Sequence, residues 1–134
     1  MNGRVAYLDS SAAVKLAVAE PQSRALLEFL AAWPEYIASA LIRVEVPRAL
    51  GRAGASAAMR RRAEETLSHI VLIGIDDDVL ARAARVEPAS LRSLDAIHLA
   101  TAMSVGDELG AFITYDERLA HAATRATLPV ESPS

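Results

Sequence analysis

Four acidic residues that lie far apart in this chain could together bind a divalent cation. Asp9 and Asp116 each follow a short apolar run typical of a β-strand, and Asp95 lies two residues after Ser93, where a helix is expected to begin. The fourth acid, Glu45, lies further inside a predicted helix, and it reaches the others only if that helix leans over the edge of the sheet. Like charges about 4 Å apart repel by roughly 4 kcal/mol per pair near a protein surface, so a carboxylate cluster needs protons or metal ions to neutralise it. The pattern of acids therefore predicts a metal site.

The metal expected at such a site is Mg²⁺, with Mn²⁺ as an alternative. The chain has no Cys, and its three His residues, at positions 69, 98 and 121, lack the spacing of metal ligands. Any metal must therefore be held by oxygen atoms, which both of these ions prefer.

Each acid also has a purely structural explanation. An Asp near a helix N-terminus is stabilised by the helix macrodipole by about 0.3–1 kcal/mol, which alone could account for Asp9, Asp95 and Asp116. The three aspartates at 76–78 occupy a similar junction between a strand and a helix, and we interpret them as capping residues. His98, one turn from Asp95, is typical of a packed core imidazole, although it could orient Asp95.

Two hydroxyl groups could hydrogen-bond these carboxylates. Ser10 follows Asp9 directly, and Thr114 lies two residues before Asp116, on the same face of the predicted strand. Either hydroxyl could equally cap a helix.

Strands and helices alternate along the whole chain. Apolar runs predict strands at residues 5–8, 36–38, 69–75 and 111–115, with a short edge strand at Val130, and the run 69–75 is typical of a buried strand. Helices are predicted at residues 12–19, from 21 or 23 to about 33, and at 40–53, 56–68, 77–85, 94–105 and 117–125. This alternation predicts an α/β fold: a single domain, residues 1–134, with a central, mostly parallel sheet of four or five strands flanked by helices on both faces. In such sheets ligands bind at the carboxyl ends of the strands, where the aspartates are expected.

Side-chain patterns predict further details of these helices. Ser10 and Ser11 offer an N-cap for the first helix, and Pro47 should kink its helix or shift its start. The apolar faces of two helices are predicted to contain Leu26, Leu27 and Leu30 in one and Leu41, Val44 and Leu50 in the other.

Charge is unevenly distributed along the chain, whose formal net charge is −3. Residues 1–67 carry a net charge of +2 and residues 68–134 a net charge of −5. A local excess of arginine lies beside Glu45, where phosphate contact is an alternative to a simple solvated helix face; it consists of Arg43, Arg48, Arg52, Arg60, Arg61 and Arg62. The apolar runs fall short of the roughly 20 residues that span a bilayer, and the N-terminal one is too short for a secretory signal. We therefore expect a protein of the cytoplasm with no membrane partner.

Four sequence blocks resemble those of PIN-domain ribonucleases, and in particular the VapC-type toxins of bacterial type II toxin–antitoxin systems. They are Tyr-Leu-Asp-Ser-Ser-Ala at 7–12, Ile-Arg-Val-Glu-Val at 42–46, Leu-Asp-Ala-Ile-His-Leu-Ala-Thr-Ala at 94–102 and Phe-Ile-Thr-Tyr-Asp-Glu-Arg-Leu at 112–119. The match covers nearly the whole chain in the right order, and the block around Asp95 is the most distinctive. Carried over, the acids of that family fall on Asp9, Glu45, Asp95 and Asp116, so the resemblance supports Glu45 where the spacing could not.

The resemblance implies a metal-dependent endoribonuclease, which hydrolyses RNA phosphodiester bonds with Mg²⁺. Asp9 and Asp95 would be the main metal ligands, Asp116 a further ligand directly or through water, and Glu45 a holder of a second ion or of the attacking water. In-line attack would leave a 5′-phosphate and a 3′-hydroxyl. The resemblance also implies a cognate VapB-type antitoxin, a homodimer, and a heterotetramer or larger assembly with the antitoxin.

Two other functions are weighed against this one. A catalytically inactive PIN-like module that only binds a partner would have no chemical reason to keep four mutually repelling carboxylates. A phosphatase of the haloacid-dehalogenase type with Asp9 as nucleophile would need a second Asp two residues later, where this chain has Ser11. We therefore set the phosphatase aside and keep the binding module as the alternative.

Overall fold

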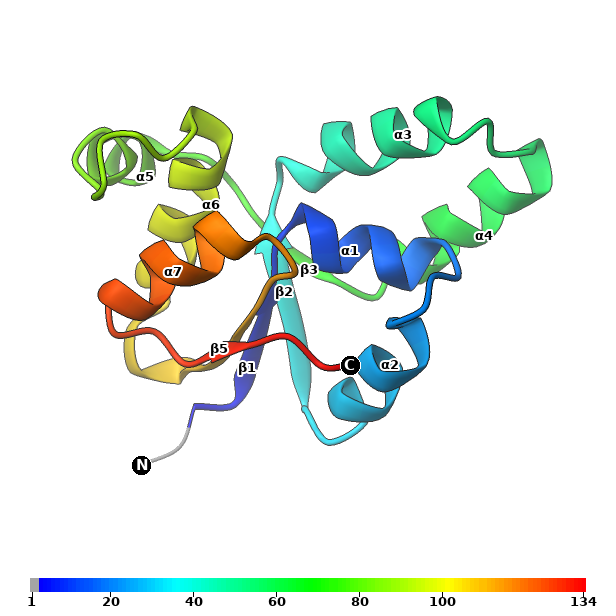
Figure 1. Ribbon diagram of the computed structural model, residues 1–134, viewed down its shortest axis with the longest axis horizontal. Helices are drawn as coiled ribbons and strands as arrows, with labels where there is room; N and C mark the ends of the chain where they lie inside the picture. The colour runs from blue at the N-terminus through cyan, green and yellow to red at the C-terminus, as the bar shows by residue number, and fades with distance from the viewer. Residues whose placement is uncertain (1–2) are drawn as a thin grey trace.

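The fold is built around one parallel β-sheet, which the computed structural model describes, with the helices that cover it, for residues 3–134 (Figure 1). The first two residues of the predicted domain lie outside the described residues. The strands are β1 (Val5–Leu8), β2 (Glu35–Ser39), β3 (Val71–Ile73), β4 (Leu109–Ile113) and β5 (Val130–Glu131). They lie in the order β3-β2-β1-β4-β5, and every neighbouring pair is parallel. The predicted α/β architecture is therefore confirmed.

The helices form two layers, one on each face of this sheet (Figure 1). One layer contains α1 (Ser10–Ala17), α2 (Ser23–Leu30), α3 (Ile42–Arg52) and α4 (Ala57–Leu67). The other contains α5 (Asp77–Ala83), α6 (Ser93–Met103) and α7 (Glu117–Arg125), with a short 3₁₀ turn, η1 (Gly106–Glu108), before β4. Because parallel strands need crossover connections, helices cover both faces, and all the strands end at the same edge.

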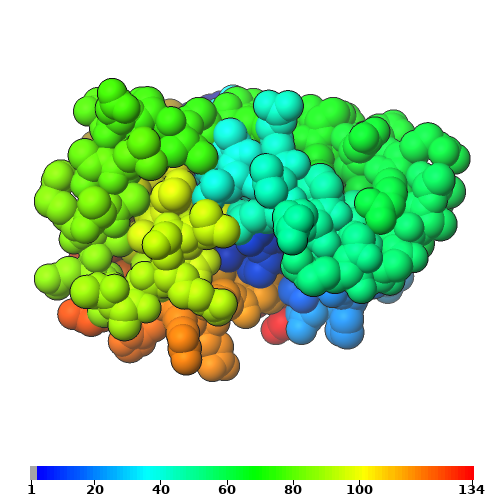
Figure 2. Space-filling view, turned by 90° about the horizontal axis from the view of Figure 1, so that it is seen from above, coloured from blue at the N-terminus to red at the C-terminus, as the bar shows by residue number. Residues whose placement is uncertain are grey.

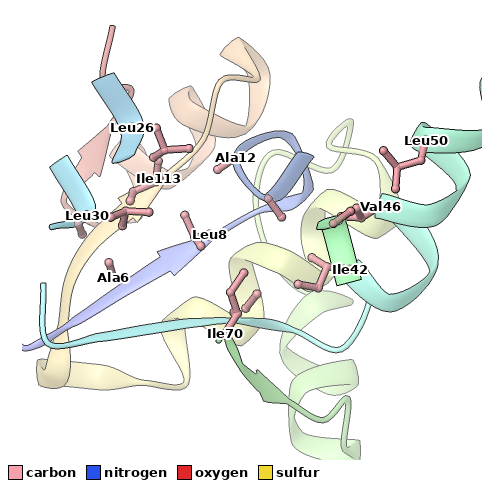
Figure 3. Close-up of a cluster of buried hydrophobic side chains, with 14 residues drawn as sticks. Ala6, Leu8, Ala12, Leu26, Leu30, Ile42, Val46, Leu50, Ile70 and Ile113 are labelled. Carbon is pink, nitrogen blue, oxygen red and sulfur yellow. The ribbon is translucent and has the colours of Figure 1, made fainter. Parts of the chain in front are cut away.

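The central strand β1 supplies side chains to both layers, because successive residues of a strand point to opposite faces. Ala6 and Leu8 belong to the core under α1–α4, and Figure 3 shows Leu8 among apolar side chains of α1, α2 and α3. Val5 and Tyr7 belong to the second core, under α6 and α7, where the Tyr7 ring stacks on Phe112 with ring centres 5.3 Å apart. Because β1 is buried on both faces, the position of Asp9, which follows it directly, is fixed by the core.

The run at 69–75 forms a much shorter and more exposed strand than predicted. Only Val71–Ile73 pair with β2, and Val71 and Leu72 are 53% and 38% exposed. β3 is an edge strand of the sheet, so an apolar, β-branched run indicated a strand correctly but not its burial.

Two predicted helix faces are partly wrong. Leu27 is 57% exposed and Val44 is 59% exposed, while Leu26 and Leu30 are buried as expected. In α3 the buried stripe is Ile42, Val46 and Leu50, which repeats every four residues and faces the sheet. That helix begins at Ile42 and continues through Pro47 to Arg52.

None of the helices within residues 3–134 combines the length and the apolar character that crossing a membrane requires.

Candidate active site

Asp9 lies at the junction between β1 and α1 and is almost completely buried, with 2% of its surface exposed. Its Oδ1 accepts hydrogen bonds from the Ser11 hydroxyl at 2.7 Å and the Ala12 backbone N–H at 2.9 Å, and its Oδ2 accepts one from the Thr114 hydroxyl at 2.5 Å. Burial raises the pKa of Asp9, and the hydrogen bonds offset this only in part, since they favour the charged form. Asp9 is thus a buried carboxylate in a fixed orientation. It also caps α1, the role predicted for Ser10 and Ser11.

Thr114 connects Asp9 with Asp116. β1 and β4 are paired so that Leu8 lies opposite Ile113, and the residues after them, Asp9 and Thr114, therefore lie side by side. The Thr114 hydroxyl donates to Asp9 and accepts the backbone N–H of Asp116 at 3.1 Å. Of the two hydroxyls considered from the sequence, that of Thr114 donates a hydrogen bond to Asp9. The other hydroxyl that binds Asp9 belongs to Ser11 rather than to Ser10.

Asp116 reaches the same edge from the start of α7. Because β4 ends at Ile113, Asp116 does not follow its strand directly, and the position equivalent to Asp9 belongs to Thr114. Asp116 is instead the N-cap of α7, where its Oδ1 accepts the backbone N–H of Leu119 at 2.9 Å. The acid predicted for this edge is present, but a turn rather than a strand end positions it.

Asp95 lies in the first turn of α6, as predicted, with 20% of its side chain exposed. Burial is the main cause of its raised pKa, and the neighbouring carboxylate of Asp116 is the second cause that raises it, with a smaller effect from Glu45. His98 and Arg92 act in the opposite direction, and Arg92 Nε lies 4.0 Å from Asp95 Oδ2. The carboxylates of Asp116 and Glu45 therefore lie near enough to Asp95 to raise its pKa.

The raised pKa of Asp95 predicts how its removal changes stability with pH. A carboxyl group that binds its proton more tightly in the folded chain contributes stability below its unfolded pKa of about 3.9, and this contribution is lost as the pH rises through the folded pKa. Asp95→Asn should therefore unfold about 1–4 °C higher than the wild type at pH 7.5 with a chelator present, since removing a partly buried charge that is repelled by its neighbours is worth up to about 1 kcal/mol. The gain should vanish near pH 4.

Calorimetry from pH 4 to pH 8 tests this expectation. Asp78→Asn is the matched control, because Asp78 also lies in the first turn of a helix, α5, but is exposed and is not one of the four acids of the site. An Asp95→Asn gain that stays constant over the pH range would contradict the explanation.

Glu45 joins the site through His98, a contact that the sequence did not predict. Glu45 Oε1 lies 2.7 Å from His98 Nε2, and His98 Nδ1 lies 2.7 Å from the Tyr7 hydroxyl. Helix α3 thus leans over the sheet edge, which periodicity could not establish. His98 is the buried, hydrogen-bonded core imidazole that the sequence favoured, and its ring nitrogens contact Glu45 and Tyr7 rather than Asp95. Burial, Asp9 and Glu45 together raise the pKa of Tyr7, so its hydroxyl keeps its proton.

The acids meet at the carboxyl edge of the sheet, between α3 and α6. Figure 2 looks down on this edge, where the start of α1 and the segment before α7 lie at the bottom of a hollow between those two helices. Within residues 3–134, no group of three or more His, Asp or Glu side chains stands in an arrangement that could hold a metal ion. The shared location of the acids is thus observed, whereas the metal site remains a prediction.

A groove of about 690 Å³ opens beside the acids, between α1 and α3. Its wall includes Glu45 together with Arg48 and Arg52, one and two turns further along α3. Neither arginine forms an ion pair with any residue of the part of the chain described here. Arg62, from the same arginine-rich stretch of sequence, lines a different groove near Tyr36. The basic residues that looked like one patch in the sequence are therefore divided between two surfaces.

Comparison with known proteins gives relatives that match along almost the whole chain. The family model of the PIN domain matches residues 6–125. Ribonuclease VapC46 of Mycobacterium tuberculosis is 48% identical over 128 residues, which cover 96% of this chain and 97% of that protein.

Two solved structures have the same fold. A toxin–antitoxin complex from Klebsiella pneumoniae contains a chain that is 26% identical, with a TM-score of 0.71 over 96% of this chain and 98% of that one. VapBC2 from Rickettsia felis, solved with a DNA fragment from its promoter, contains a chain with a TM-score of 0.74 at 12% identity, covering 97% of this chain and 99% of that one. The parallel sheet and its helical layers are thus shared with these proteins.

Proposed function

This chain belongs to the PIN-domain family, and we propose that it is a Mg²⁺-dependent endoribonuclease that acts as the toxin of a toxin–antitoxin pair. The observation that supports the proposal most is the meeting of four acids, Asp9, Glu45, Asp95 and Asp116, at one rim beside a groove lined by Arg48 and Arg52. Similarity to a ribonuclease over 96% of the chain supports the reaction class.

The side chains at this rim suit a hard divalent cation. Every acid there offers carboxylate oxygens, and the repulsion between Asp95 and Asp116 that raises the pKa of Asp95 is the interaction that a cation would relieve. Asp9, Asp95 and Asp116 would hold Mg²⁺ or Mn²⁺, with Asp116 bound directly or through water. When bound, such an ion stabilises charge on a phosphate and lowers the pKa of a coordinated water.

The residues of the chain would orient the other participants. Ser11 and Thr114 fix the orientation of the Asp9 carboxylate and favour its charged form, because both donate hydrogen bonds to it. Glu45, exposed over 19% of its side chain, would hold the attacking water or a second ion. Attack in line with the leaving oxygen would give a 5′-phosphate and a 3′-hydroxyl, with no role for the 2′-hydroxyl.

Arg48 and Arg52 would bind RNA phosphates that flank the cleaved bond. Replacing both with Ala should weaken RNA binding by about 10-fold or more at 0.15 M salt, with little change in kcat. The slope of log affinity against log salt concentration should become shallower by the amount that corresponds to about two phosphate contacts. Binding is measured with a catalytically inactive variant at several salt concentrations. Arg85→Ala combined with Arg125→Ala is the control, because these residues line a cavity beside α6 and α7. Equal weakening by both pairs would exclude a specific role for Arg48 and Arg52.

The same groove would receive a segment of a cognate VapB-type antitoxin, whose Arg or Lys could pair with the acids and block turnover. The named toxin–antitoxin structures with this fold support such a partner, and with it a homodimer that forms a heterotetramer or a larger assembly. An enzyme that acts on cellular RNA would work in the cytoplasm.

Incubation of the purified protein with total RNA tests the proposed activity. We expect cleavage in Mg²⁺ that a chelator abolishes, with 5′-phosphate ends that sequencing can map, and the mapped ends would identify the RNA that is cut. A folded protein that neither cleaves RNA nor binds Mg²⁺ in a calorimetric titration would favour the inactive partner-binding module.

A further inference from the structure

Glu45 is held differently from Asp9 and Asp116. Asp9 and Asp116 follow closely after strands and cap the helices that begin there, so backbone N–H groups orient both carboxylates. Glu45 lies inside α3, a helix whose own N–H groups bond along the helix, and its carboxylate is partly exposed. The hydrogen bond that orients it comes from His98, on the opposite wall of the site.

His98 is itself fixed on both sides. The ring is fully buried on α6, and both its nitrogens have partners at 2.7 Å, Glu45 at Nε2 and the Tyr7 hydroxyl at Nδ1. Tyr7 is fully buried in the central strand, stacked on Phe112 with an interplanar angle of 2°. The ring of Tyr7 meets that of His98 edge-on, at 78°. The contacts that start at Glu45 and pass through His98 therefore end at Tyr7, which the packing of β1 holds rigidly.

The partners determine the direction of these hydrogen bonds. An ionised carboxylate only accepts, so His98 Nε2 must carry a hydrogen and donate it to Glu45. A neutral imidazole then has Nδ1 free to accept, and a phenol hydroxyl can donate to it. With a neutral imidazole the hydrogen bonds therefore run from the Tyr7 hydroxyl to His98 Nδ1 and from His98 Nε2–H to Glu45 Oε1.

We propose that Tyr7 and His98 are positioning residues that transmit the rigidity of β1 to Glu45 and hold its carboxylate at the catalytic rim. The inference rests on the proposed function in one respect, since that function gives Glu45 its role in cleavage. A buried His and Tyr could instead serve only the packing of the core. That role would lower stability when either residue is changed, but it would not depend on Glu45.

The first test observes the hydrogen-bonded chain directly, without metal or RNA. Long-range ¹H–¹⁵N NMR of the histidines in chelated wild-type protein should show His98 as the neutral form with hydrogen on Nε2 and none on Nδ1. Tyr7→Phe should shift Nδ1, and Glu45→Ala should shift Nε2, while the signals of His69 and His121 stay in place. A His98 with hydrogen on Nδ1, or one that does not respond to Glu45→Ala, would overturn the proposal.

The second test measures coupling in catalysis. His98→Gln can keep a donor near the Nε2 position, whereas His98→Asn is too short to do so. We expect His98→Asn to lower kcat by about 10–100-fold with KM nearly unchanged, the usual effect of removing a partner that orients a site residue, and His98→Gln to recover most of that loss. In a Glu45→Ala background the Asn and Gln variants should have equal kcat, because His98 then has nothing to orient.

Stability is controlled with Leu99→Val, a buried apolar change on the same helix that leaves the side chains of His98 and Glu45 unaltered. This variant should lose stability and keep its kcat. If His98→Asn and Glu45→Ala lowered kcat independently, so that their effects multiplied in the double variant, His98 would serve only the packing of the core. Absence of any cleavage by the wild type would instead refute the proposed ribonuclease, while the NMR experiment would still decide whether the positioning chain exists.

Discussion

Asp95→Asn should lower the rate of RNA cleavage in Mg²⁺ by at least about 1,000-fold, equivalent to about 4 kcal/mol of transition-state stabilisation. Asn has almost the same shape as Asp, so the first turn of α6 should remain intact. The variant loses one negative charge, at the position that the carboxylates of Asp116 and Glu45 both influence. Cleavage is measured with a labelled RNA under single-turnover conditions, and circular dichroism verifies the fold.

The same experiment separates loss of chemistry from loss of folding. Asp78→Asn makes the same substitution in the first turn of α5 and should cleave at the wild-type rate. Asp95→Asn should also bind Mg²⁺ more weakly in a calorimetric titration, although it unfolds at a higher temperature in chelator. An Asp95→Asn variant with full activity would remove Asp95 from the reaction.

The positions of Asp9 and Asp95 could be predicted from sequence because local rules determine them. An apolar strand that ends at Leu8 places Asp9 at the carboxyl edge of a parallel sheet, and a helix that starts near Ser93 places Asp95 at the same edge. Both depend only on short segments and on the parallel arrangement of the strands. The prediction that Asp9 and Asp95 lie at this edge is therefore correct, even where predicted helix ends differ by one or two residues from those observed.

The contacts of Asp116 and Glu45 could not be predicted in this way. Asp116 is displaced two residues from its strand because β4 ends early, and only the register between β1 and β4 shows that Thr114 takes the place beside Asp9. The bond between Glu45 and His98 depends on the angle at which α3 and α6 face each other across the sheet. Hydrophobic periodicity describes which side of one helix is buried, and it contains no information on that angle. Family resemblance identified Glu45, but only the structure explains how it is held.

Exposure was also beyond what local patterns could determine. Apolar residues that are typical of buried segments occur in the run around β3 and on the predicted faces of α2 and α3. Leu27, Val44 and Val71 are nevertheless more than half exposed. Their burial depends on which strand lies at the sheet edge and where each helix crosses it, and these are tertiary properties.

Two substitutions of Asp9 should separate its structural role from its catalytic one. Asn caps helices as well as Asp does, and it can still accept hydrogen bonds from Ser11 and the Ala12 N–H. Loss of charge from a buried site whose pKa is raised by burial compensates for a weaker bond to Thr114. Asp9→Asn should therefore retain a free energy of unfolding within about 1 kcal/mol of the wild type at neutral pH in chelator, yet cleave RNA at least about 1,000-fold more slowly.

Asp9→Ala should lose both properties. It removes the cap of α1, worth about 0.5–2 kcal/mol, and it leaves the buried Thr114 hydroxyl without its acceptor, which costs about 1–3 kcal/mol. The expected loss in denaturant titration is therefore about 1.5–5 kcal/mol. If Asp9→Asn were as unstable as Asp9→Ala, the slow cleavage of both would follow from damage to α1, and the buried carboxylate would be a structural cap. Because Asn and Ala differ in capping but both lack the charge, only a catalytic Asp9 can make the two variants equally inactive and unequally stable.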